Sequence, residues 1–153
     1  MATTISKDSI TSLVGSSLEA SPWFQVKQDQ INAFADTTLD HQFIHVDPER
    51  AAGTPFGATI AHGFLTLSML SHFAESFGVV IDGVQMGINY GFDKVRFLNP
   101  VTVDSEVRAV AEVMDVTEKN PGQFMIKYQV TVEIKGSDKP ALMAEWLTLQ
   151  IVA

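Results

Sequence analysis

The sequence predicts an α+β fold in which an antiparallel sheet wraps around one long, buried helix. Three observations predict it: an apolar helical segment at residues 63–77, later segments that alternate with a two-residue period, and links of hairpin length. The chain has 153 residues, 46% of them hydrophobic and 18% charged, which is typical of one globular domain with a substantial core. We therefore expect a single domain over residues 1–153.

The first third of the chain is predicted to contain helices around one short extended segment. Apolar residues recur at helical spacing over residues 10–18 and again over 28–37, and residues 21–26 between them read as strand-like. Asp47 is a favourable N-cap for a short helix over residues 48–52, because Pro is preferred as the first helical residue. The amphipathic pattern of the helix at 28–37 predicts that it packs on a core.

The long helix is predicted to begin near Gly63 and to end before Gly78, a residue favoured just beyond a helix. Its apolar residues cover almost the whole circumference, which indicates a helix enclosed by other elements. Each large side chain buried there contributes roughly 1.5–3 kcal/mol before entropy is subtracted. We therefore expect this helix to be a major source of stability.

The second half of the chain is predicted to form strands. The apolar positions change parity after Phe92, which indicates a β-bulge near Gly91 or Asp93. Asn-Pro-Gly at residues 120–122 is a turn signal between two strands. The expected strands are residues 86–97, 107–113, 124–134 and 142–152.

The composition excludes several classes of function. Lys and Arg number 10 against 18 Asp and Glu, so the formal charge of −8 offers no basic footprint for nucleic acid. The absence of cysteine excludes disulfides, thiolate metal sites and cysteine nucleophiles. No segment reaches the 18 apolar residues of a membrane span, and the N-terminus lacks the apolar core of a signal peptide. We expect a cytoplasmic protein without nucleic-acid or membrane partners.

The first candidate for chemistry is Asp40 with His45. In a continuous helix, five residues would separate the two side chains by about 140° around the axis, so they converge only if the backbone turns. A carboxylate and an imidazole that share one water can act as a general acid and base. The structural alternative is that Asp40 caps a turn and His45 packs under Phe43.

Other polar groups allow further interpretations. His41 and His45 could chelate a metal from one helical face, but Asp47 places both before the next helix and no zinc signature is present, so no metal is predicted. His62 and His72 read as structural histidines or as pocket residues. At Gly63, a backbone N–H at the start of the long helix could bind a developing oxyanion, or the glycine could serve close packing alone. No nucleophile elbow or phosphate-binding loop occurs.

Four separated segments carry a resemblance to a known family. The chain reads Asp-His-Gln-Phe-Ile-His-Val-Asp-Pro-Glu-Arg from residue 40 and Ile-Ala-His-Gly-Phe-Leu from residue 60. It then reads Asn-Tyr-Gly-Phe-Asp-Lys-Val-Arg-Phe-Leu-Asn-Pro-Val from residue 89 and Ala-Glu-Trp from residue 144. These segments resemble the hydratase-2 motif of MaoC-like dehydratases, and within them the nodulation-protein-N-like branch. The resemblance spans most of the chain from about Trp23 onward.

The resemblance implies a hot-dog fold and a homodimer. It also implies an (R)-specific enoyl-CoA hydratase of fatty acid metabolism, which reversibly adds water to a trans-2-enoyl thioester of coenzyme A. We expect no cofactor. The family's catalytic Asp and His match Asp40 and His45, and its backbone N–H donor matches Gly63. The family pattern Asp-x-Asn-Pro-x-His is altered here, because Gln42 and Phe43 replace the Asn and the Pro.

Substrate contacts are expected at further positions. A supporting serine of the family matches Ser71 in the central helix, and we expect Gln42 and His62 to contact the substrate beside it. Lys94 and Arg96 are expected to contact the phosphates of coenzyme A.

Two other functions remain open from the sequence. A hot-dog thioesterase would hydrolyse the thioester, but such enzymes usually place a carboxylate on the helix, where Glu75 is the only acidic residue. A non-catalytic acyl-thioester binding protein would keep the pocket and tolerate loss of the dyad. Because both Asp40 and His45 are present, we rank binding below catalysis.

Overall fold

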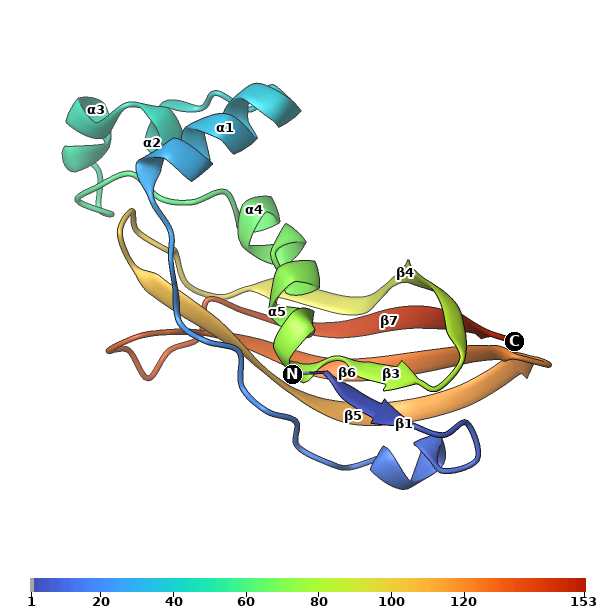
Figure 1. Ribbon diagram of the computed structural model, residues 1–153. Helices are drawn as coiled ribbons and strands as arrows, with labels where there is room; N and C mark the ends of the chain where they lie inside the picture. The colour runs from blue at the N-terminus through green and yellow to red at the C-terminus, as the bar shows by residue number, and fades with distance from the viewer. Residues whose placement is uncertain (1) are drawn as a thin grey trace.

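The computed structural model describes residues 2–153, and Met1, the first residue of the expected domain, lies outside them. A five-stranded antiparallel sheet with the strand order β2-β5-β6-β7-β4 curves around the helices α4 and α5 (Figure 1). A two-stranded parallel pair, β1 with β3, lies beside it and was not predicted. The strands are β1 Thr3–Ile5, β2 Phe24–Gln25, β3 Val79–Ile81, β4 Val84–Phe97, β5 Glu106–Asn120, β6 Gln123–Ile134 and β7 Leu142–Val152.

The predicted strands of the second half are confirmed, except that β5 continues to Asn120, beyond the predicted end at residue 113. The turn at residues 120–122 is also confirmed. Strands β5 and β6 pair from Val107 opposite Ile134 to Asn120 opposite Gln123. Gly122 closes this hairpin at φ +77°, where a Cβ atom would lie 2.6 Å from the carbonyl oxygen of Val152. The predicted bulge in β4 is confirmed by register shifts against β7 between residues 89 and 91 and between 92 and 94.

The central helix was predicted as one continuous element, and this is wrong at one residue. It consists of α4, Gly63–Ser68, and α5, Leu70–Phe77, with Met69 between them at φ −71° and ψ −8°. The hydrogen bonds continue through the break, because Met69 N donates to Leu65 O at 3.1 Å and Phe73 N donates to Met69 O at 3.0 Å.

Burial around the central helix is one-sided, which corrects the prediction of full enclosure. Leu70, Phe73 and Phe77 are buried against the sheet, whereas Phe64 is 67% exposed. The sheet curves around only one side of the helix, so the other side of α4 stays open (Figure 1). The apolar circumference therefore overstated how much of this helix the core covers.

The N-terminal third differs more from prediction. The helix expected over residues 10–18 is a single 3₁₀ turn, η1 Ile10–Leu13, after which the chain bonds to β5 through Leu18 N and Ala111 O. Of the strand-like residues 21–26, Phe24 and Gln25 pair with β5. Three helices follow: α1 Gln28–Thr38, α2 Phe43–Val46 and α3 Pro48–Ala52. Helices α1 and α3 confirm the predictions for residues 28–37 and 48–52, whereas α2 was not predicted.

The cap of α3 is the one expected from the sequence. A carboxylate oxygen of Asp47 accepts a hydrogen bond from Arg50 N at 3.1 Å, ahead of Pro48. The three short helices form a separate group above one end of the sheet, at the N-terminal end of α4 (Figure 1). Within residues 2–153, no helix is long and apolar enough to cross a membrane.

Candidate active site

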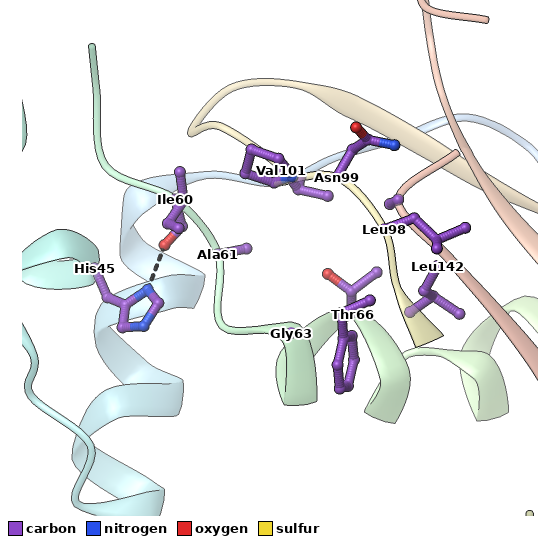
Figure 2. A pocket seen from close by; sticks show the side chains of 12 residues that line it. His45, Ile60, Ala61, Gly63, Thr66, Leu98, Asn99, Val101 and Leu142 are labelled. Carbon is purple, nitrogen blue, oxygen red and sulfur yellow. Dashed lines mark hydrogen bonds between the residues drawn. The ribbon is translucent and has the colours of Figure 1, made fainter. Parts of the chain in front are cut away.

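A cavity of about 260 Å³ lies where the helical group meets α4. Figure 2 shows its walls, which come from α2, the segment before α4, α4 itself and the segments that follow β4 and precede β7. The walls are mostly apolar, and His45 brings an ionisable side chain to one end (Figure 2). The lining residues are His45, Ile60, Ala61, Gly63, Thr66, Phe97, Leu98, Asn99, Pro100, Val101, Ala141 and Leu142.

His45 was predicted to lie in a turn, but it lies on α2 and its side chain is only 7% exposed. Its Nδ1 is 2.7 Å from the carbonyl oxygen of Ile60. A carbonyl can only accept, so Nδ1 carries the hydrogen and Nε2 keeps its lone pair. The helix is held from both sides, because Ile60 N donates to Ile44 O and the Gln28 side chain donates to His45 O.

Burial lowers the pKa of His45 below its ordinary value of 6.5, and it is the largest of the influences on that pKa. The hydrogen bond to Ile60 and the charge of Asp40 oppose this shift, whereas His62 adds to it. The imidazole is therefore neutral at neutral pH, with Nε2 available as a proton acceptor.

Asp40 reaches the same place from the turn after α1. Leu39 ends that helix in the left-handed conformation, at φ 64° and ψ 22°, and so reverses the chain. The carboxylate of Asp40 is 54% exposed, and one of its oxygens accepts a hydrogen bond from Gln42 N at 3.3 Å. The turn-capping role considered from the sequence is therefore present. The same turn also brings the carboxylate into a group with His45 and His62 whose ligand atoms all lie within 4.8 Å of one another.

His62 contacts both of these residues. Its side chain is 3% exposed, and its ring stacks on that of His45 with centroids 3.8 Å apart. Its Nε2 lies 3.0 Å from the main-chain oxygen of Asp40 and 4.0 Å from a carboxylate oxygen of the same residue. Among residues 2–153, the cavity wall includes His45 and Gly63 but not His62.

Gly63 is the first residue of α4, so its N–H has no acceptor within the helix. A Cβ atom at this position would lie 2.9 Å from Cδ1 of Phe97, which lines the same cavity. Close packing against Phe97 is therefore one reason for a glycine here. It also means that the backbone here borders the cavity with no side chain in the way.

The remaining predicted contacts lie further away. Gln42 is the exposed N-cap of α2. Ser71 is exposed on α5, accepts a hydrogen bond from Asn89 Nδ2 at 3.3 Å and lines a different pocket, against β4 and Trp146. Lys94 and Arg96 are exposed on β4 and line a groove that shares Leu98 with the His45 cavity. The structure thus brings Asp40, His45, His62 and Gly63 together and leaves Ser71 apart.

Two polar lining residues were missed by the sequence reasoning. Thr66 is buried one helical turn after Gly63, and this three-residue spacing on one helix face could have identified it. Asn99 follows β4, and its side chain donates to Pro140 O at 2.7 Å, which joins the two segments that close the cavity. No local signal separates that asparagine from an ordinary turn residue.

Metal binding has limited geometric support. His41 bonds to Asp36 at 2.9 Å and is not part of the group formed by Asp40, His45 and His62. Within that group, one nitrogen of each histidine is already bonded to a main-chain carbonyl. The two rings are inclined by only 21°, so their in-plane lone pairs do not converge on one point between them. The contacts suit proton transfer better than ligation.

Known proteins are similar to this chain in sequence and in fold. A family model described as a MaoC like domain matches residues 9–136. Nodulation protein N of Rhizobium meliloti (strain 1021) is 49% identical over 146 residues, covering 95% of this chain and 91% of the relative. The 3-hydroxyacyl-thioester dehydratase Z of Mycobacterium tuberculosis (strain CDC 1551 / Oshkosh) is 46% identical over 136 residues, covering 89% of each protein.

A solved structure also resembles this chain in its fold. The (R)-hydratase from A. caviae involved in PHA biosynthesis superposes with a TM-score of 0.67 and 26% identity, covering 87% of this chain and 97% of that one. The curled antiparallel sheet around a central helix is the hot-dog fold expected from the sequence. With a family model covering most of its length, the chain belongs to the family of MaoC-like domains, which includes hydratases and dehydratases.

Proposed function

We propose that this protein is an (R)-specific enoyl-CoA hydratase, which reversibly adds water to trans-2-enoyl-CoA to give (R)-3-hydroxyacyl-CoA. One observation carries the proposal: the carboxylate of Asp40 lies within 4.8 Å of a ring nitrogen of His45, and His45 lines an apolar cavity. The dehydratase and hydratase names of two relatives support the reaction class.

The proposed mechanism uses one water held between Asp40 and His45. In the hydration direction, Nε2 of His45 accepts a proton from this water while the water oxygen bonds to C3 of the alkene. The electron pair of the double bond moves towards the thioester carbonyl. C2 then takes up a proton from His45, which returns to its neutral form. Both additions come from one face, and dehydration reverses the steps. A positioned acid or base of this kind typically contributes about 100- to 10,000-fold.

The thioester oxygen gains negative charge during this step, and the N–H of Gly63 is the proposed donor to it. The N–H borders the cavity and has no acceptor within α4. Loss of one such donor typically costs about 2.7–4 kcal/mol of transition-state stabilisation. Lys94 and Arg96 are proposed to bind the phosphates of coenzyme A, because their groove meets the cavity at Leu98.

A homodimer is proposed to cover the edge strand β4. This strand stands at the end of the sheet and exposes Met86, Ile88, Tyr90 and Phe92. Unpaired edges with apolar side chains are normally covered in native proteins. Light scattering at micromolar concentration tests this, and a species of 16.7 kDa alone contradicts it.

The test of function is to incubate the protein with enoyl-CoA thioesters of increasing chain length and to follow alkene loss and free thiol together. We expect alkene loss without thiol release. Thiol release would identify a thioesterase. A result with neither alkene loss nor thiol release would favour a binding protein. Glu75 gives the thioesterase alternative little support, because its side chain is 75% exposed and lies 3.8 Å from that of His72. A cytoplasmic location stays a prediction from the sequence.

A further inference from the structure

We infer that His62 is a positioning residue. It keeps the main chain of Asp40 and the imidazole of His45 in fixed positions relative to each other, and it does not contact the substrate. The inference rests on the proposed function and gives a role to a second histidine of the same site. From the sequence, His62 was expected to contact the substrate. Its burial and its bonded nitrogen argue against that role, because the ring is only 3% exposed and stands outside the cavity wall.

The first contact of His62 fixes Asp40. The main-chain oxygen of Asp40 can only accept, so His62 Nε2 carries a hydrogen and donates to it across 3.0 Å. The loop that holds Asp40 begins at Leu39, whose φ of 64° is costly for a residue with a Cβ atom. An exposed carboxylate on such a turn needs a tether to keep a fixed position, and the buried ring of His62 provides one.

The second contact of His62 fixes His45. The two rings are stacked with centroids 3.8 Å apart and planes inclined by 21°. The ring of Phe34, from α1, also contacts His62, at 4.9 Å between centroids. The next residue after His62 is Gly63, the proposed donor to the thioester oxygen. One buried side chain thus connects α1, the Asp40 turn, α2 and the start of α4.

The other ring nitrogen of His62 makes no polar contact. With the hydrogen on Nε2, Nδ1 is buried without a hydrogen-bond partner among residues 2–153. Among these residues the ring is therefore held by the Nε2 bond to Asp40 and by its contacts with the rings of His45 and Phe34.

Two variants separate the contacts. His62→Phe keeps a ring for stacking but removes the donor to Asp40, whereas His62→Gln keeps an amide N–H near the position of Nε2 but removes the ring. His72→Gln on α5 is the matched control, because His72 is an exposed histidine outside the proposed site. Each protein is assayed in its native assembly across a pH series, with kcat and KM measured separately and melting temperatures recorded.

We expect His62→Phe to lower kcat by about 10- to 100-fold with little change in KM, since small misplacement of a reacting group can cost that much. His62→Gln should retain more activity than His62→Phe. A raised KM at unchanged kcat would identify a substrate contact. A lower melting temperature at unchanged kcat would identify a purely structural residue.

A second measurement needs no substrate and so separates this inference from the proposed function. In protein labelled with ¹⁵N-histidine, the Nε2 signal of His62 should report a bound hydrogen, because this atom donates to the main-chain oxygen of Asp40. The ring signals of His45 should shift in His62→Gln, because the stacked ring is lost, whereas His72→Gln should leave them unchanged. No hydrogen on Nε2 of His62, or unchanged His45 signals in His62→Gln, would overturn the inference even in an active enzyme.

Discussion

The sheet of this protein and its site layer, the group formed by α1, α2 and residues 59–66, differ in the kind of side chain that they bury. In β5 up to Val113 and in β6 from Ile126 to Val132, buried apolar residues alternate with less buried ones, and each strand pairs with a long partner, as in Val107 opposite Ile134. In the layer of α1, α2 and the start of α4, the buried groups include Thr59, His45 and His62, each bonded to a residue distant in sequence. The sheet supplies stability, whereas the layer holds polar groups in position at some cost in burial.

This contrast predicts that changes in the site layer act mainly on activity. Asp40→Asn and His45→Gln should each lower turnover by about 100- to 10,000-fold, the range for loss of a positioned acid or base. If both residues act on one water, the double variant should be scarcely worse than either single one. Turnover of all three proteins on an enoyl thioester measures this.

The two substitutions should differ in stability. Asp40 is exposed, so Asp40→Asn should leave the melting temperature unchanged, whereas His45→Gln should lower it because the buried bond to Ile60 is disturbed. Asp36→Asn, an exposed change that removes the pair with His41, is the control. A well-folded Asp40→Asn protein with native turnover would contradict the proposed dyad.

In the core below the site, the expected effect is on stability. Phe73 on α5 is buried, and Phe73→Ala should lower the free energy of unfolding by about 3–5 kcal/mol, as is usual for such truncations. The exposed Phe64 is the matched control, and Phe64→Ala should change stability by about 0.5 kcal/mol or less. Denaturant unfolding of both variants measures the difference. Equal losses would mean that the central helix is enclosed after all.

Gly63 lies where the two regions meet, so a change there should affect both properties. In Gly63→Ala the new methyl group meets the ring of Phe97, which is half exposed and can move aside, so we expect a cost of about 1 kcal/mol, the low end for overpacking. We expect lower turnover as well, because the clash displaces the proposed N–H donor. Adding Phe97→Leu should restore part of both. If the second change restores stability but no turnover, the donor role is supported separately from packing.

The smallest expected effect is the pH dependence of stability that comes from His45. Burial lowers its pKa in the folded protein, so above the ordinary value of 6.5 the residue is neutral in both states and adds no pH dependence. As the pH falls through 6.5 towards the lower folded pKa, the unfolded chain binds the proton first and stability is lost. Melting temperatures at stepwise lower pH should fall less for His45→Gln than for the native protein. An identical fall in both would show that His45 does not titrate as described.

Much of the fold could be predicted because its signals are local. A two-residue alternation places side chains on one face of a strand whatever the rest of the chain does, so residues 107–113, 124–134 and 142–152 were assigned correctly. The helix at 28–37 and the cap at Asp47 likewise depend on neighbours within a turn. The failure at residues 10–18 has a physical reason: helical spacing was outweighed by main-chain bonds to β5, which lies far away in sequence.

The site divides in the same way. The sequence by itself determined which chemical groups are present, Asp40, His45 and the N–H of Gly63, and that a turn must join the first two. Only the tertiary structure decided that His45 is buried with its Nδ1 bonded to Ile60, that His62 stacks against it, and that Ser71 lies in another pocket. The reason is that burial and hydrogen bonding between distant segments depend on how the helical group packs over α4, which no local pattern records.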